Sequence, residues 1–354
     1  MGTIVKRQSG YQAQTCINGK RRTKTFRKQA DAKRWIAQVE LDAVHGLIPE
    51  AHLPVSNHLI TYRQEVTERR VHFRHESAVI GCFLDDPISK IPISAVDAND
   101  IYAWIDRRRT IPSKRTGRLV EEGTIARQLQ TLSAFFSWAV KRELIKENPC
   151  TGVDRPEDSK PRERVASDEE IELIKFVAGW EECTTPITLT QRVAAAFILA
   201  CTTGMRAGEM MRIERSWIHG RIIKIPAEAA KTRTKREIAL NDRAFSIITH
   251  VLELGCYPTI WGMSDASRDA LWRKIRDKAG LQEVRDSEGR LLKQGLTFHD
   301  GRATFCTWAA SPGEDGAPRL DVMSLARQTG HKNLKMLMRY YRPSVESFVD
   351  RLNK

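Results

Sequence analysis

The sequence lacks the cysteine and apolar patterns that mark zinc proteins and membrane proteins. Its seven cysteines form no CxxC pair, and no cluster of cysteine and histidine has the spacing of a zinc site. An odd, scattered set of this kind favours reduced thiols in a cytosolic protein. The longest apolar run, Val193–Cys201, is too short to span a membrane, and residues 1–20 contain no apolar core of a signal peptide. The sequence therefore predicts a cytoplasmic protein with no membrane partner.

Acidic residues are too few to balance the basic ones. The 354 residues include 58 lysines and arginines against 44 aspartates and glutamates, a net charge of +14. This excess favours a polyanionic partner, usually nucleic acid, although an acidic membrane surface would also fit. Residues 1–50 carry much of the excess, which indicates a dedicated nucleic-acid arm. The chain is longer than one typical core, so two or three domains are expected.

Residues 1–50 have the pattern of a small β-sheet followed by one helix. Strands are predicted at 3–7, 11–17 and 20–26, with the hairpin signal Asn18-Gly19 before the third. A helix over 29–45 follows, because apolar residues recur there at helical spacing. The basic third strand would fit a DNA groove; the alternative is a small folding cap with a solvated basic face. The residues predicted to contact DNA are Lys20, Arg21, Arg22, Lys24 and Arg27.

Residues 55–153 are predicted to form a helical bundle. The clearest helix runs over 124–142, with Thr124 as its N-cap and a continuous apolar stripe. Asn148-Pro149 ends the bundle, and the charged segment 154–164, with two prolines, has the composition of an exposed linker. The other helices are expected at about 57–69, 76–83 and 101–108.

Residues 165–354 are predicted to form a mostly helical domain that contains one β-hairpin. Ser167 with Glu170 forms a capping box at its first helix, and Thr188 with Gln191 could form one at the helix over 189–203. The strands are expected at 221–226 and 236–240. Further helices are expected at 189–203, 207–214, 242–253, 267–279, 300–310, 322–329 and 334–341. The predicted fold class is therefore multidomain and mainly α, with small β elements.

The second half of the chain holds groups that can bind a phosphodiester. Arginine suits this task because its planar guanidinium can hold two oxygens. Arg206 is placed at the start of a predicted helix, where the backbone also attracts phosphate. His299 and Arg302, three residues apart on a predicted helix, share a face. Taken singly, each arginine is more often a surface charge, so neither defines a site alone.

Three further residues can transfer a proton or attack phosphorus. Lys231, at the tip of the predicted hairpin, could act as a general acid, although Lys224, Lys235 and Arg236 lie nearby. His331 follows a glycine at a turn, where a lone histidine is usually structural. Tyr340 could form a covalent phosphotyrosyl enzyme, although a lone tyrosine there is usually part of a core. No carboxylate cluster of metal-ligand character accompanies them, which favours chemistry without metal or other cofactor.

The segments around these residues resemble the tyrosine recombinases of the phage-integrase family. Thr-Thr-Gly-Met-Arg-Ala-Gly-Glu (202–209) resembles the first arginine motif. Leu-Thr-Phe-His-Asp-Gly-Arg-Ala-Thr-Phe (296–305) resembles the His-x-x-Arg box. Thr-Gly-His-Lys-Asn (329–333) resembles the box of the second histidine, and Met-Arg-Tyr-Tyr (338–341) the nucleophile box. The family interval from that histidine to the nucleophile selects Tyr340, with Tyr341 as the alternative.

The resemblance implies three domains and one reaction. Residues 1–50 would be the arm-type DNA-binding domain, 55–153 the helical, SAM-like core-binding domain and 165–354 the α+β catalytic domain. A homotetramer would synapse two double-stranded DNA sites in the bacterial nucleoid, and DNA-bending and directionality factors are further partners of such systems. Tyr340 would form a 3′-phosphotyrosine on the way to a Holliday junction, in the integration or excision of a phage or other mobile element. Arg206, Arg302 and His331 would stabilise the phosphate, Lys231 would be the general acid, and His299 would assist proton transfer.

The sequence departs from the family motifs at two places, and two alternative functions remain to be distinguished. The box around Arg302 commonly reads Leu-Arg-His, whereas here it is Gly301-Arg302-Ala303, and Arg342 stands where the family often has a histidine. Both put local packing in question, not the reaction class. The rivals are a type IB-like topoisomerase, which acts as a monomer, and a non-catalytic DNA-binding protein. The segment after Tyr340 is expected to pack on a neighbouring protomer.

Overall fold

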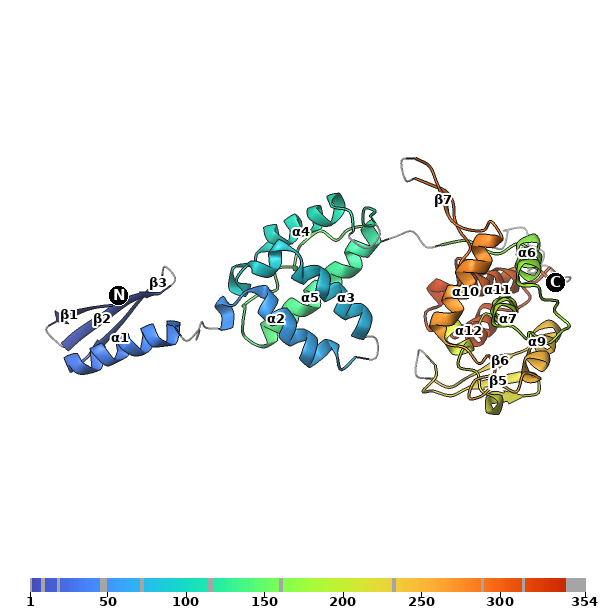
Figure 1. Ribbon diagram of the computed structural model, residues 1–354, viewed down its shortest axis with the longest axis horizontal. Coiled ribbons are helices and arrows are strands. Elements are labelled where there is room, and N and C mark those ends of the chain that lie inside the picture. Colours follow the sequence, from blue (N-terminus) through green and yellow to red (C-terminus); the bar gives the residue numbers. More distant parts are fainter. Residues whose placement is uncertain are drawn as a thin grey trace, which may run out of the picture. The chain divides into compact units, whose positions relative to one another are not determined.

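The computed structural model divides into two compact units, residues 1–161 and 162–354. It describes residues 2–7, 10–17, 20–44, 50–70, 73–113, 117–158, 162–230, 234–287, 290–313 and 316–341, but not the side chains of 16, 17, 20–22 and 38–44. The predicted Asn18-Gly19 turn, Lys231 and the segment after Tyr341 lie outside the described residues. The fold is mainly helical with small sheets, as the sequence predicted (Figure 1).

The first unit begins with a three-stranded antiparallel sheet of order β1-β2-β3. Its strands are β1 (Thr3–Arg7), β2 (Gly10–Ile17) and β3 (Lys20–Phe26), within one residue of the predicted bounds. Helix α1 (Gln29–Val44) lies along one face of the sheet (Figure 1). Ala13 from β2 and Ala32 and Ile36 from α1 form the small core between them.

Among the described residues of the first unit, four α-helices follow and enclose a separate apolar core. They are α2 (Val55–Tyr62), which continues as a π-helical turn over Arg63–Thr67, α3 (Phe73–Leu84), α4 (Ala98–Thr110) and α5 (Glu122–Lys141). The apolar stripe of α5 is buried, from Ile125 to Ala139. The prediction that Thr124 caps α5 is wrong. The helix begins two residues earlier, where Glu122 receives two hydrogen bonds from Arg109.

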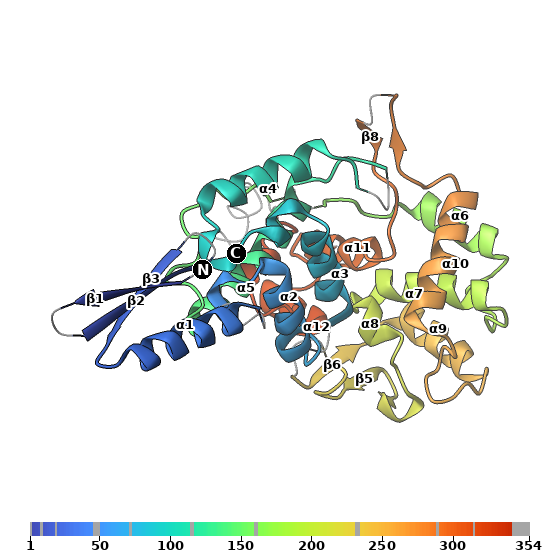
Figure 2. The same cartoon turned by 60° about the vertical axis from the view of Figure 1, so that its left-hand side comes forward.

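The second unit is built around α7 (Leu189–Thr203), whose residues from Val193 to Thr203 are all buried. Both expected capping boxes form, Ser167 with Glu170 at the start of α6 and Thr188 with Gln191 at the start of α7. Helices α6 (Asp168–Ala178), α9 (Asp242–Leu252), α10 (Asp265–Lys278) and α11 (Asp300–Ala310) all contact α7 (Figure 2). A helix that is buried from Val193 to its end is a rigid support for the residues that follow it.

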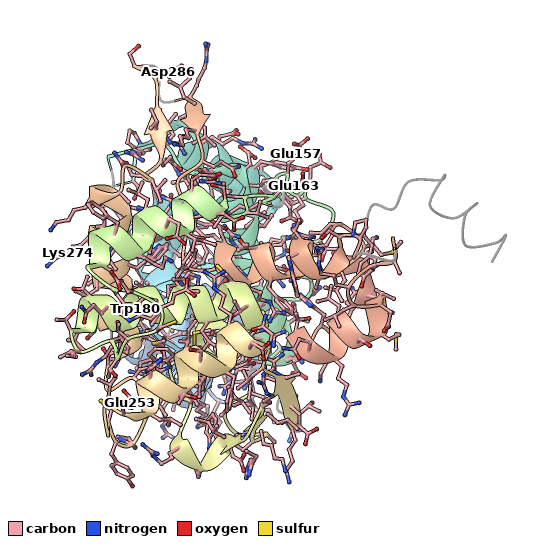
Figure 3. The ribbon with its side chains drawn as sticks, turned by 90° about the vertical axis from the view of Figure 1, so that its right-hand side faces the viewer. Glu157, Glu163, Trp180, Glu253, Lys274 and Asp286 are labelled. Carbon is pink, nitrogen blue, oxygen red and sulfur yellow. The ribbon has the colours of Figure 1, made fainter. Side chains whose placement is uncertain are left out.

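Two small sheets complete the second unit. Strands β4 (Ile218–His219), β5 (Ile222–Ile225) and β6 (Arg236–Ala239) form an antiparallel sheet, whose last strand contacts α12 (Val322–Thr329). Strands β7 (Val284–Arg285) and β8 (Leu291–Lys293), which the sequence did not predict, form a hairpin. This hairpin projects from the unit, with Asp286 near its tip (Figure 3).

Two predicted helices are wrong in length or type. The helix after Arg206, expected over 207–214, is the short α8 (Ala207–Met210). The helix expected over 334–341 is instead a 3-10 turn, Leu334–Met336, followed by further turns. Leu337 is the buried residue in this stretch, whereas Leu334 and Met338 are exposed. One buried anchor does not supply the continuous apolar stripe that stabilises a helix by packing.

Candidate active site

Arg206 lies at the junction between α7 and α8. Gly204, with a φ of +66°, ends α7 in the left-handed conformation and turns the chain. Arg206 then occupies the N-cap position of α8. Its Nη2 donates to the carbonyl oxygen of Gly330 at 2.7 Å, and its Nη1 donates to Oε1 of Glu209 at 3.2 Å. The first predicted arginine is therefore joined to the segment that carries His331.

Arg302 points from the first turn of α11 into the centre of the same cluster and is only 4% exposed. Its Nη1 donates to the carbonyl oxygens of Gly204, at 2.7 Å, and Thr329, at 2.8 Å. Burial, and after it the positive charge of Arg206, lowers the pKa of Arg302 to about 10. A partly desolvated guanidinium beside a second one is a site that an anion would stabilise.

His331 follows Gly330, which ends α12 with a φ of +69°. Both ring nitrogens lie close to Nη2 of Arg302, Nδ1 at 3.2 Å and Nε2 at 3.1 Å. Burial and the nearby arginines, Arg302 first, lower the pKa of His331 to about 3. The structure thus brings together Arg206, Arg302 and His331, as the sequence predicted. The two guanidinium charges favour the binding of an anion beside the neutral ring.

A buried ion pair lies next to this cluster and contacts Arg206. Glu209 is 2% exposed and accepts hydrogen bonds from both Arg206 and Arg236, whose side chain is also buried. Burial lowers the pKa of Arg236. The sequence marked Arg236 only as a neighbour of Lys231 and Glu209 only as a motif residue. Their pairing depends on the approach of β6 to α8, which no spacing rule predicts.

Gln328 fixes α12 to the edge of β6. Its side-chain amide exchanges two 3.0 Å hydrogen bonds with the backbone of Ala239, and its Nε2 also donates to the carbonyl oxygen of Thr203. The hairpin between β5 and β6, which contains Lys231, is thereby tied to the helix that precedes His331. The sequence did not indicate this role for Gln328.

The two candidate nucleophiles lie in different surroundings. The hydroxyl of Tyr341 donates to the carbonyl oxygen of Leu320. Among the described residues, none makes a hydrogen bond with the hydroxyl of Tyr340, which packs against a cluster that includes Cys306, one turn beyond Arg302 on α11. Burial raises the pKa of Tyr340, whereas Arg339 and Arg302 act in the opposite direction. Tyr340 therefore has the freer hydroxyl of the pair.

Comparison with known proteins identifies the family. The model of the phage integrase family matches residues 164–347, more than half of the chain and the whole of the cluster described above. The chain belongs to the phage integrase family. It is a site-specific recombinase of the tyrosine class, as its sequence predicted.

Individual relatives extend the similarity along the chain. A putative integrase/recombinase of Haemophilus influenzae is 27% identical over 98% of this chain and 88% of its own length. The Tn1549 transposon integrase in complex with a circular intermediate DNA covers 85% of this chain and 99% of its own, at 18% identity and a TM-score of 0.62. A lambda integrase tetramer bound to a Holliday junction covers 93% of this chain and 95% of its own, at 17% identity and a TM-score of 0.60. At these identities the two solved structures support the fold alone.

The two remaining candidates from the integrase motifs are His299 and Lys231. His299 is the N-cap residue of α11 and is exposed, and its carbonyl oxygen accepts from the backbone N–H of Arg302. Lys231 lies outside the described residues. The described residues contain no group of three or more histidine, cysteine or acidic side chains that could hold a metal ion. No helix in the described part of the chain is long and apolar enough to cross a membrane.

The unusual Gly301 of this integrase has a packing reason. A Cβ at position 301 would lie 3.1 Å from Cβ of Ala200 and 3.2 Å from both Sγ of Cys201 and the ring of Phe197. Helix α11 can therefore approach α7 closely at this point. The departure from the common Leu-Arg-His pattern marks a tight helix contact directly beside Arg302.

The basic residues of the N-terminal sheet are only partly described. Lys24 and Arg27 are exposed, whereas the side chains of Lys20, Arg21 and Arg22 lie outside the described part. In the register of the sheet Lys24 pairs with buried Ala13, so both share the face that α1 covers, and Nζ of Lys24 lies over the Phe26 ring. The opposite, open face carries alternate residues that the sequence reading did not single out: Arg7, Gln12, Gln14, Thr23 and Thr25.

Proposed function

We propose that this integrase breaks and rejoins double-stranded DNA through Tyr340. The phenolic oxygen loses its proton and attacks the scissile phosphorus, forming a 3′-phosphotyrosine as the bond from phosphorus to the 5′-oxygen breaks. Lys231 protonates the leaving oxygen, and His299 assists proton transfer. A free 5′-hydroxyl of the partner strand then reverses the reaction, so the energy of the phosphodiester is conserved.

The observation that carries this proposal is the convergence of Arg206, Arg302 and His331. Two guanidinium groups, held by the backbone carbonyls of Gly204, Thr329 and Gly330, and the imidazole beside Arg302 would face the charge that develops on the non-bridging oxygens. Groups already held in place need little reorganisation when the reaction occurs. The Tyr341 hydroxyl is held by Leu320, which supports Tyr340 as the nucleophile.

Trapping on a nicked duplex tests the assignment. The core site would come from the DNA that flanks the gene, and cleavage next to the nick would release a short fragment and leave a covalent adduct. The wild type should form the adduct, and Tyr340→Phe should bind DNA without forming it. Tyr341→Phe should still form it, although loss of the bond to Leu320 should cost about 0.5–1.5 kcal/mol of stability. An adduct with Tyr340→Phe and none with Tyr341→Phe would reverse the assignment.

We propose that the parts of the chain divide this work. Residues 1–50 would bind arm-type sites, 55–153 core sites, and 165–354 would carry catalysis. Four protomers would act on two core sites through a Holliday junction, like the lambda integrase tetramer. DNA-bending and directionality factors would join them in the bacterial nucleoid, where the protein would insert or excise a phage or other mobile element. Relaxation of plasmids that lack a target site, without recombination, would instead indicate the topoisomerase alternative.

Charge reversal at Lys24 and Arg27 tests whether residues 1–50 bind arm-type sites. Lys24 and Arg27 are exposed, so Lys24→Glu with Arg27→Glu should weaken binding to accessory sites and lower its salt dependence, while cleavage of an isolated core site is unchanged. Exposed Arg34 is the control, because it lies on α1, whereas Lys24 lies on β3 and Arg27 directly follows it. Equal losses in Arg34→Glu and in the double variant would indicate non-specific attraction only.

A further inference from the structure

Thr329, the last residue of α12, touches two members of the active site, although it is fully buried. Its carbonyl oxygen accepts from Nη1 of Arg302 at 2.8 Å. Its hydroxyl oxygen lies 2.7 Å from Nδ1 of His331 and 2.6 Å from the carbonyl oxygen of Leu325. No water or DNA oxygen can replace these contacts without opening the end of α12.

The hydroxyl has one hydrogen for its two short contacts. The carbonyl oxygen of Leu325 can only accept, so the hydroxyl of Thr329 must donate to it; otherwise two oxygens would face each other at 2.6 Å with no hydrogen between them. Towards His331 the same oxygen is then an acceptor. The contact with Nδ1 therefore requires a hydrogen on Nδ1.

Arg302 does not decide which ring nitrogen carries the hydrogen. Its Nη2 is almost equally distant from Nδ1 and Nε2, at 3.2 and 3.1 Å, so it lies beside the ring and on the lone-pair axis of neither nitrogen. The neutral state is favoured by burial of the ring and then by the charges that surround it, which come from Arg302 on α11, Arg206 before α8, Arg236 on β6 and Arg339. Among the described residues, Thr329 is the one whose contact is directed at a single ring nitrogen.

We propose that Thr329 is a positioning residue: its hydroxyl, oriented by the carbonyl of Leu325, holds the Nδ1–H of His331 and confines proton exchange to Nε2. In the neutral ring Nε2 carries a lone pair. When a DNA phosphate adds negative charge, Nε2 takes up a proton from water and can donate to a phosphate oxygen, while the bond from Nδ1 to Thr329 is unchanged. This inference deepens the proposed function, because it concerns the same His331.

Nitrogen NMR of histidine-labelled full-length protein tests the tautomer directly, without DNA and without a variant at Thr329. His331→Asn identifies the signals of this ring. The wild type should show Nδ1 protonated and Nε2 unprotonated. An Nε2–H tautomer in the wild type would overturn the inference, whatever the outcome of the trapping experiment with Tyr340→Phe, so the two proposals fail separately.

Variants then connect the tautomer with the rate. Thr329→Val keeps the shape but lacks the hydroxyl. It should lose the Nδ1–H signature and slow single-turnover cleavage by about 10-fold, the effect of losing one hydrogen bond, with DNA affinity unchanged. Thr329→Ser should restore both. Thr202→Val is the control, because among the described residues the partners of that buried hydroxyl are the helix carbonyls of Ile198 and Leu199. Equal losses of rate in the serine and valine variants would show that Thr329 acts through packing and would overturn the proposal.

Discussion

Arg206 donates a 2.7 Å hydrogen bond to the carbonyl oxygen of Gly330, 124 residues further along the chain. Arg302 makes the complementary contact, from α11 to Gly204 at the end of α7. Each glycine ends a helix in the left-handed conformation, which exposes its carbonyl oxygen to an arginine from elsewhere. The helix ends and the arginines therefore hold one another in place.

Gly330→Ala should affect activity more than stability. A Cβ at position 330 would lie 2.3 Å from Nη1 of Arg236, which would have to leave its place beside Glu209. Gly280→Ala is a matched control, because Gly280 has a φ of +67° but nothing within 4 Å of an added Cβ. Both should lose about 1–2 kcal/mol of unfolding free energy from backbone strain, but only Gly330→Ala should lose cleavage. Equal cleavage rates in the two variants would show that cleavage does not depend on the close packing of Arg236 against Gly330.

Arg162→Gln should destabilise the catalytic unit. Arg162 donates to both carboxylate oxygens of Asp300, which is 3% exposed, and to the carbonyl oxygen of Gly295. Its removal leaves a buried carboxylate short of donors, which should cost about 1–3 kcal/mol. Arg155→Gln is the control. Arg155 pairs with exposed Asp158, so its substitution should cost almost no unfolding free energy. Denaturant unfolding of the full chain measures the unfolding free energy of both variants. Equal losses would show that the contact of Arg162 with buried Asp300 does not stabilise the unit.

Stability should fall on acidification in a way that depends on His331. The unfolded chain binds a proton at this residue near pH 6.5, whereas the folded chain does so only near pH 3. The unfolded state thus holds more protons in this window, and the unfolding free energy falls as the pH drops from 6.5 towards 3. His331→Gln should flatten the profile measured by denaturant titration at several pH values. The same substitution at exposed His219 serves as the control, and parallel profiles for wild type and His331→Gln would refute the prediction.

Gly301→Ala should be destabilising although it removes a glycine from a helix. The added methyl group would crowd Ala200, Cys201 and Phe197, which belong to the core of α7 and have little room to move. The cost should be about 1 kcal/mol or more. Gly208→Ala in α8, where nothing lies within 4 Å, should instead be neutral or stabilising by up to about 1 kcal/mol. Thermal unfolding measures the stability of both variants. A gain in stability in both would show that α11 and α7 can move apart at little cost.

The sequence by itself determined what depends on local patterns. Capping residues and apolar periodicity fixed α7 and its Thr188–Gln191 box, because helix ends and buried stripes are set by neighbours along the chain. The spacing of the integrase motifs selected Arg206, Arg302 and His331. The helix expected over 334–341 does not form, since its apolar pattern was too short and too exposed to be stabilised by packing.

The tertiary structure decided how these residues are held. Glu209 meets Arg236, Gln328 meets Ala239 and Thr329 meets both His331 and Arg302 because helices and strands distant in sequence pack together. Such contacts leave no periodic signal, since each depends on the relative position of two elements rather than on the spacing within one. The sequence thus named the groups that act on a phosphate, and only the packing of α7, α11 and α12 shows which buried atoms orient them.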